Sequence, residues 1–256
     1  MKQIIVIIGM GEMGGVFARG FLRSGYPVYP ITRNMDINAE VAKIPDPALV
    51  LLAVGEGDLH ASLETIPAPW RDKLALLQNE LLPRDWINAG YEQPTAISVW
   101  FEKKKGQDVK VLISSPAFGP GADLLLEAMS AIDIDARKVA SAAEMAYELV
   151  RKNVYILTTN IAGLECGGTV ESLWNEHQAL AREVAGEVMD IQQWLTGTEL
   201  DRERLIDGFV EGINGDLAHQ CMGRSAPSRL KRALGFADEA GLAVPKLRAI
   251  YTTHVS

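Results

Sequence analysis

Cysteine and histidine are scarce in this sequence, which limits both disulfides and metal sites. Cysteine occurs twice and histidine four times among 256 residues. Cys166 and Cys221 have no partner motif and no metal-ligand spacing, so we expect reduced thiols in a cytoplasmic protein. No two histidines stand at metal-ligand spacing, so we expect no metal site. For His219, beside Gln220, we expect a structural hydrogen bond, and a position facing a substrate cleft is the alternative.

Long apolar runs and an excess of positive charge are also missing. No segment approaches the about 20 apolar residues that a membrane-spanning helix needs. The net charge of −8 argues against nucleic acid and anionic membrane surfaces as partners. Hydrophobic residues make up 48% of the chain and charged residues 23%, which predicts a soluble protein with one large core or two smaller ones. An anionic ligand must therefore meet cations that are locally concentrated.

The stretch that organises the chain is an apolar run, residues 4–8, that leads into the glycine-rich turn GMGEMG. A helical pattern follows, Gly25 stands at its end, and an extended pattern then resumes. This order predicts a β-α-β unit whose helix N-terminus binds the phosphates of a dinucleotide. Gly9 permits the tight turn, Gly11 lets a pyrophosphate approach, and Gly14 lets the helix pack closely. The cofactor-binding candidates here are Gly9, Met10, Gly11, Glu12, Met13 and Gly14.

The end of the second strand indicates which dinucleotide binds. A site for NAD normally has Asp or Glu there to accept the ribose 2′-hydroxyl, whereas this chain has Thr32, Arg33 and Asn34. The planar fork of Arg33 suits a phosphate, so we predict NADPH, with the two neutral neighbours assisting. Asp36, two residues further on, is the alternative ribose ligand.

Two further apolar runs, residues 48–54 and 74–77, predict strands buried on both faces of a parallel sheet. Ligands of such sheets bind at the carboxyl ends of the strands. We therefore expect Val54 beside the adenosine or ribose of the cofactor, although a flexible turn explains this segment equally well. Asn79, whose amide both donates and accepts, is expected at the nicotinamide or the substrate.

The remainder of this half is expected to complete the sheet. Residues 96–101 and 109–113 flank a charged segment, which predicts a hairpin. We expect the lysine triplet at residues 103–105 to be a solvated turn. A helix over residues 122–131 and an extended segment over 132–139 follow.

From residue 141 onward the pattern is helical. Ser141 and Glu144 form a capping-box pair, and apolar residues recur at helical spacing as far as Gly163. We predict a dinucleotide-binding domain, residues 1–140, and a helical substrate domain, residues 141–256, with a small substrate in the cleft between them. Further helices are expected over residues 172–195, 201–217 and 227–240.

Lys152 and Asn160 are the candidates for chemistry in the helical half. Offsets of three, four, seven and eight residues return to one helix face, so Lys152, Tyr155, Ile156, Thr159 and Asn160 share a stripe. Reduction of a carbonyl by hydride creates negative charge on oxygen, which must be stabilised and protonated. A partly buried lysine does both, and an asparagine holds the other polar end of the substrate. Composition alone makes Lys152 an ordinary surface lysine.

Taken together, these motifs resemble the ketopantoate reductase family. The resemblance lies in the glycine turn with Arg33, in Asn79, in the segment 148–152 with Asn160 eight residues later, and in residues 241–245. It implies an α/β fold, with an N-terminal Rossmann-type NADP-binding domain. An all-helical C-terminal domain like that of 6-phosphogluconate dehydrogenase follows, and a homodimer is possible.

The same resemblance implies an activity, the NADPH-dependent reduction of 2-dehydropantoate to pantoate in pantothenate and coenzyme A biosynthesis. Lys152 matches the lysine of the family that protonates the carbonyl oxygen of the substrate. Asn160 matches one of two asparagines that contact the substrate. Asn79 matches the asparagine that follows a strand of the nucleotide domain.

Three positions depart from the family pattern. Ile156 replaces the second substrate asparagine, Gly55 replaces a lysine often found there, and Ser225 falls where a late glutamate engages the catalytic lysine. Either a compact variant of the enzyme uses Asn214, Gln220 or Ser225 instead, or the substrate differs.

Two other functions combine a nucleotide domain with helices. One is a related enzyme, either a β-hydroxyacid dehydrogenase or an imine reductase of the pyrroline carboxylate type. The other is a non-catalytic redox sensor that binds NADPH, which the missing glutamate favours. A panel of substrates separates the enzymes from one another, and tight NADPH binding without turnover identifies the sensor.

Overall fold

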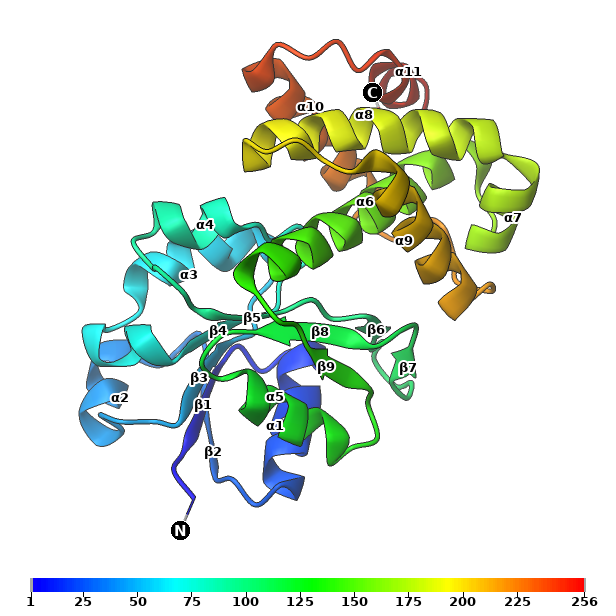
Figure 1. Ribbon diagram of the computed structural model, residues 1–256. Coiled ribbons are helices and arrows are strands. Elements are labelled where there is room, and N and C mark those ends of the chain that lie inside the picture. The colour runs from blue at the N-terminus through cyan, green and yellow to red at the C-terminus, as the bar shows by residue number, and fades with distance from the viewer. Residues whose placement is uncertain (1, 256) are drawn as a thin grey trace. The chain divides into compact units, whose positions relative to one another are not determined.

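A computed structural model describes residues 2–255 of the chain (Figure 1). These residues form two compact units, the first ending at Leu149 and the second beginning at Val150. Helix α6, Ala142–Cys166, carries the chain from one unit into the other.

The first unit is built on a mainly parallel sheet of seven strands in the order β2-β1-β3-β4-β5-β8-β9. Strand β1 lies between β2 and β3, so Ile5 pairs with both Val28 and Leu49. Strand β8 runs antiparallel to β5. The side chains of β1 and β3 are buried throughout, as the apolar runs predicted. The strands are β1 Ile5–Ile8, β2 Val28–Ile31, β3 Leu49–Leu52, β4 Leu74–Leu76, β5 Thr95–Ile97, β8 Ser115–Phe118 and β9 Ala136–Lys138.

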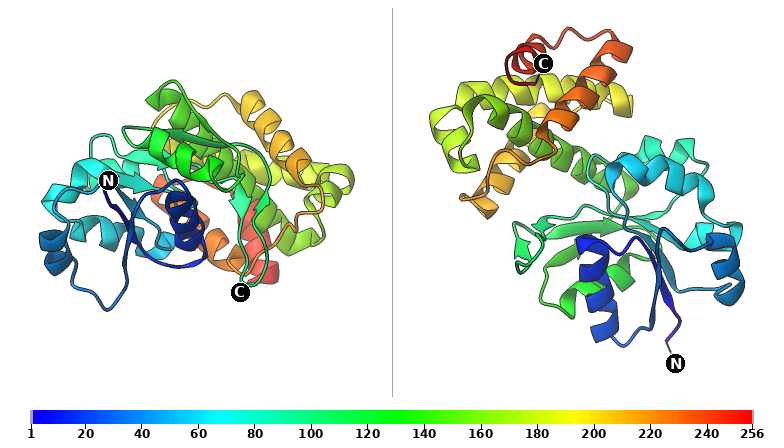
Figure 2. Two further views of the ribbon diagram at one scale, coloured as in Figure 1. Left: turned by 90° about the horizontal axis from the view of Figure 1, so that it is seen from below. Right: turned by 180° about the vertical axis from the view of Figure 1, so that it is seen from behind.

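Helices cover both faces of this sheet. Helices α1 and α5 pack against each other on one face, and α3 and α4 lie on the other (Figures 1 and 2). The fold class is therefore α/β, with helical crossovers between parallel strands, as predicted. The helices are α1 Glu12–Arg23, α2 Ile37–Lys43, α3 Leu59–Thr65, α4 Pro83–Asn88 and α5 Ala122–Ser130, with 3₁₀ turns η1 Glu56–Asp58 and η2 Ala68–Lys73.

The predicted hairpin is present, although its strands are short. Strand β6, Phe101–Glu102, pairs antiparallel with β7, Lys110–Val111. Phe101 is buried, and its ring packs on that of Phe17 in α1 with a centroid distance of 6.2 Å. This contact holds the hairpin against the helix that follows the glycine turn.

The second unit is helical. The predicted capping box at the start of α6 is present in part, since the Glu144 N–H donates to Ser141 Oγ, while the Glu144 carboxylate accepts from Ala140 rather than from Ser141. Gly241 ends α10 in a left-handed conformation, which glycine adopts without strain. The remaining helices are α7 Val170–Glu176, α8 Gln178–Thr196, α9 Arg202–Gly215, α10 Ala226–Ala240 and α11 Pro245–His254.

One helix prediction needs correction, and four helices were not predicted. The helix expected over residues 172–195 is two helices that meet at His177, whose φ and ψ of −124° and 33° interrupt the helix. Helix α11 lies beyond the last helix expected from the sequence. Helices α2, α3 and α4 occupy segments where no helix was predicted. They have six or seven residues each, too few for an apolar periodicity to become visible.

The contact between α1 and α5 gives a direct test of this fold. A Cβ atom at Gly20 would lie 2.4 Å from the carbonyl oxygen of Ala128, whereas a Cβ at Gly15 meets nothing within 4 Å. We expect Gly20→Ala to lower the free energy of unfolding by about 1–3 kcal/mol, because the two helices must separate. Gly15→Ala is the matched control and should raise it by up to about 1 kcal/mol through helix propensity. Denaturant titrations of both variants measure these changes. Equal effects of the two substitutions would contradict the close packing.

Candidate functional site

The glycine turn after β1 has the geometry that a dinucleotide-binding turn needs. Gly9 has a φ of +95°, and a Cβ there would lie 2.7 Å from the carbonyl oxygen of Ala53. A Cβ at Gly14 would lie 2.1 Å from the carbonyl oxygen of Gly9. At Gly11, by contrast, nothing lies within 4 Å of where a Cβ would be. Two of the glycines therefore bring turn, helix and sheet together, and the third leaves the backbone open to a ligand.

The N-terminus of α1 is directed at this opening. Gly11 is the N-cap and supplies no side-chain cap, and the first hydrogen bond within the helix runs from the Gly15 N–H to the Gly11 carbonyl. The N–H groups of Glu12, Met13 and Gly14 therefore have no acceptor within the helix. Such groups, together with the helix dipole, attract anions.

The residues after β2 form an exposed turn. The Met35 N–H donates to the Thr32 carbonyl at 3.0 Å, and the Arg33 side chain is 95% exposed. Arg33 Nη2 lies 3.8 Å from a carboxylate oxygen of Asp58, in η1 after β3. Asp36 caps α2 by accepting the Asn38 N–H. The Arg33 guanidinium is thus accessible to a phosphate, which would compete with the Asp58 carboxylate for this cation.

The carboxyl ends of β3 and β4 are linked through side chains. Gln78 is buried, and its Nε2 donates to the carbonyls of Leu52 and Val54. Asn79 Nδ2 donates to Glu56 Oε1 at 3.0 Å. Val54 and Asn79 are therefore held at one edge of the sheet, although their contact with a cofactor stays a prediction.

In the second unit, Lys152 is 7% exposed and so is not a surface lysine. Its neighbours on α6 are anchored to other helices of the unit. Arg151 donates to the Gly208 carbonyl and pairs with Glu211 at 2.9 Å, and Asn153 donates to Gln192 at 3.1 Å. The surroundings of α6 therefore fix the orientation of Lys152 about the helix axis.

Asn160 has a structural role in this unit. Its Nδ2 donates to the Ile156 carbonyl at 2.9 Å, and its Oδ1 accepts the Gly223 N–H at 3.3 Å. A Cβ at Gly163, one turn further, would lie 2.8 Å from the Cβ of Cys221. Asn160 therefore helps to hold residues 221–223 against α6, and its contact with substrate stays a prediction.

The two cysteines are free thiols. Burial raises the pKa of Cys221 to about 12, to which nearby Cys166 contributes, and burial also raises the pKa of Cys166. Both thiols are therefore protonated near neutral pH and are poor nucleophiles.

His219 lies beside an acidic and an aromatic side chain. Its Nδ1 is 3.8 Å from Asp216 Oδ2, and its ring packs on that of Tyr155.

Neither a metal-binding cluster nor a helix able to span a bilayer is found among residues 2–255. No group of three or more His, Cys, Asp or Glu side chains in this part of the chain is arranged to hold a metal ion. Within the same range, no helix has both the length and the apolar character that crossing a bilayer requires.

Two residues at this edge of the first unit make contacts that were not predicted from the sequence. Glu56 bonds to Asn79, and the adjacency of β3 and β4 would have predicted this meeting, since both residues follow strand ends. Lys103 was expected to be solvated, yet its Nζ lies 3.3 Å from Glu12 Oε2, at the start of α1. No local signal identifies Lys103, because the contact depends on how the hairpin folds back.

No protein-family model and no curated protein matches this sequence. Solved structures, however, match it over nearly its whole length. A PanE/ApbA family ketopantoate reductase from Ralstonia eutropha JMP134 has a TM-score of 0.68 at 15% identity, covering 97% of this chain and 96% of the other. A dimeric ketopantoate reductase from Staphylococcus aureus has a TM-score of 0.65 at 16% identity, covering 97% and 96%.

D-mandelate dehydrogenase in complex with NADH is a further match, with a TM-score of 0.66 at 15% identity, covering 98% of this chain and 97% of the other. At these identities the likeness concerns the fold. The chain has the fold seen in ketopantoate reductase structures, as the sequence resemblance implied.

Proposed function

We propose that the protein is an NADPH-dependent reductase of a small 2-oxo acid, with 2-dehydropantoate as the first candidate substrate. The observation that carries the proposal is the glycine turn, where Gly9 and Gly14 have no room for a Cβ while Gly11 is open. Ketopantoate reductases of known structure share the fold over both units, which supports the reaction class. The proposed setting is the cytoplasm, and the dimeric Staphylococcus aureus enzyme makes a homodimer the expected assembly.

The residues of the first unit fit a dinucleotide. The N–H groups at the start of α1 would receive its pyrophosphate, Arg33 its 2′-phosphate, and Val54 and Asn79 its ribose and nicotinamide ends. The backbone turn at residues 32–35 would place the two neutral neighbours of Arg33 beside the adenosine. When bound, the cofactor supplies a hydride to the carbonyl carbon of the substrate.

Lys152 is proposed to hold the proton at Nζ that the carbonyl oxygen of the substrate receives. An ammonium stabilises the developing oxyanion before it gives up that proton. The anchoring of Arg151 and Asn153 supports this role, because it keeps the lysine in one orientation. Asn79 and Asn160 are proposed to orient the substrate.

One observation favours a second candidate, an NADH-dependent reductase of another 2-oxo acid. Asp58 Oδ2 lies 3.8 Å from Arg33 Nη2, and a carboxylate at this position repels a bound 2′-phosphate. The D-mandelate dehydrogenase of the same fold forms a complex with NADH. Assays with both cofactors against a panel of 2-oxo acids, β-keto acids and cyclic imines distinguish this candidate, the imine reductase and the redox sensor.

Lys152 is the proposed proton donor. Lys152→Ala should lower kcat with 2-dehydropantoate by about 10²–10⁴-fold, because a general acid typically contributes that much. NADPH affinity should stay unchanged. Lys231→Ala, an exposed lysine of α10, is the matched control and should leave kcat as it is. The decrease in NADPH absorbance measures turnover, and fluorescence titration measures binding. Unchanged turnover in Lys152→Ala would remove this residue from the mechanism.

Arg33 and Asp58 are proposed to set the preference between NADPH and NADH. Arg33→Ala should weaken NADPH binding by about 10-fold or more and leave NADH binding unchanged, since only NADPH carries the 2′-phosphate. Asp58→Asn should act in the opposite direction and raise the preference for NADPH a few-fold. Calorimetric titration of each variant with both cofactors measures the ratio of affinities. A ratio that neither substitution alters would place the 2′-phosphate elsewhere.

A further inference from the structure

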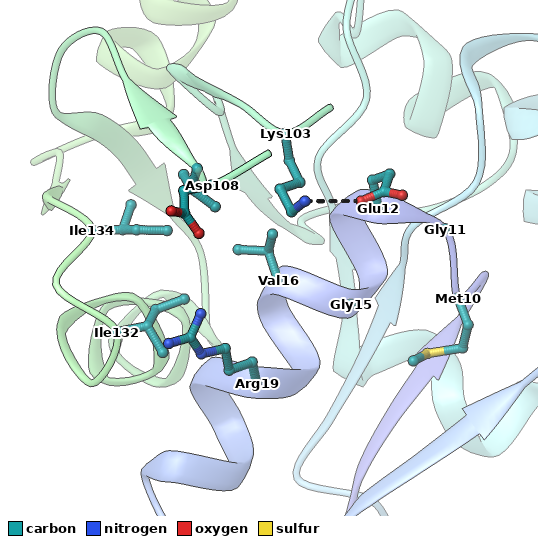
Figure 3. A pocket seen from close by; sticks show the side chains of 11 residues that line it. Met10, Gly11, Glu12, Gly15, Val16, Arg19, Lys103, Asp108, Ile132 and Ile134 are labelled. Carbon is teal, nitrogen blue, oxygen red and sulfur yellow. Dashed lines mark ion pairs between the residues drawn. The ribbon is translucent and has the colours of Figure 1, made fainter. Parts of the chain in front are cut away.

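Lys103 differs from the other lysines at the tip of the hairpin. Its side chain is 21% exposed, and its Nζ donates to the carbonyls of Lys104 and Gln107. The same Nζ lies 3.3 Å from Glu12 Oε2 (Figure 3). Lys104 is 57% exposed and pairs with Glu102 within the hairpin. Lys103 is therefore the lysine that the hairpin holds against the start of α1.

A cavity of about 440 Å³ lies along α1 beside this ion pair. The glycine turn contributes Met10 and Gly11, and the hairpin contributes Lys103 and Asp108 (Figure 3). The apolar part of the wall comes from α1 and from the segment before β9. The cavity thus extends from the turn, where a dinucleotide would bind, to a cation on a separate element. The lining residues of α1 and the segment before β9 are Glu12, Gly15, Val16, Arg19, Ile132 and Ile134.

Glu12 creates an electrostatic problem for phosphate binding. It occupies the first position of α1, where the helix dipole favours a carboxylate. A pyrophosphate bound at the N–H groups of the same turn would be repelled by that carboxylate. The chain carries a net charge of −8, so bulk electrostatics do not offset this repulsion. A cation placed beside both Glu12 and the pyrophosphate offsets part of this repulsion.

We propose that Lys103 binds the pyrophosphate of the dinucleotide, exchanging its partner from Glu12 to a phosphate oxygen when the cofactor binds. The inference rests on the proposed function and adds a residue to that site. The two hairpin carbonyls keep the ammonium in place in both situations, so the exchange needs only a small movement. The pair with Glu12 is partly exposed, and such pairs cost little to break.

Binding of ADP-ribose tests this role apart from catalysis, because ADP-ribose has the pyrophosphate but neither nicotinamide nor 2′-phosphate. Lys103→Ala should weaken the binding of ADP-ribose, NADH and NADPH by the same factor, about 10- to 100-fold, because a hydrogen-bonded ion pair with the pyrophosphate is lost. Lys103→Arg should retain most of the affinity. Lys104→Ala, on the neighbouring residue, is the matched control and should bind as the natural protein does. Calorimetric titration measures all three ligands, and thermal melting confirms that each variant is folded.

Arg33→Ala gives an internal contrast, because this substitution is expected to lower the affinity for NADPH alone. Glu12→Gln should tighten ADP-ribose binding a few-fold, since the repulsive carboxylate is gone. The inference would be overturned if Lys103→Ala changed the affinity for ADP-ribose by less than twofold. It would also be overturned if this variant lost affinity for NADPH only. In either case the natural protein still binds dinucleotides, so the proposed function stands. If the natural protein binds none of the three ligands, both the proposed function and the role of Lys103 are wrong.

Discussion

The close approach of α1 to the sheet is the constraint on which the candidate site depends. The backbone of the turn, the first turn of α1 and the residue after β3 meet without room for a methyl group at Gly9 or Gly14. Any larger residue would move the helix away from the strand ends. The contact therefore fixes where the N–H groups of α1 point, and it does so through glycines, which have no side chain.

Charge at this edge of the sheet is arranged by pairing. Arg33 faces Asp58 and Lys103 faces Glu12, each with a nitrogen-to-oxygen distance below 4 Å. Exposed or partly exposed pairs of this kind contribute only about 0–1 kcal/mol. If a phosphate binds as proposed, it therefore displaces the carboxylate at small cost. Under the proposed function, this pairing would let an acidic chain receive an anionic cofactor, and the two carboxylates would weaken the binding of the phosphates beside them.

The parts of this structure that were readable in the sequence are those set by neighbours along the chain. The glycine turn, the buried strands and the Ser141 cap each depend on a few consecutive residues. Helix α2 begins at a cap made by Asp36, and within the first turn of α4 the Asp85 carboxylate accepts the Leu82 N–H. These short segments gave too little pattern to be recognised. The position of Lys103 depends on the packing of Phe101 on Phe17, 84 positions apart in sequence numbering, and no local pattern encodes such a contact.

The polar residues of α6 show how a helix can hold a charged group in a defined direction. Successive residues of a helix differ by about 100°, so Arg151 and Asn153 project to either side of Lys152. Burying these polar side chains would be costly if they had no hydrogen-bond partners. Arg151 finds its partners in Glu211 and the Gly208 carbonyl, and Asn153 finds its partner in Gln192. Rotation of α6 would break these bonds on both sides together. The direction of Lys152 about the helix axis is thus determined by its two neighbours, as the proposed transfer of a proton to one substrate atom requires.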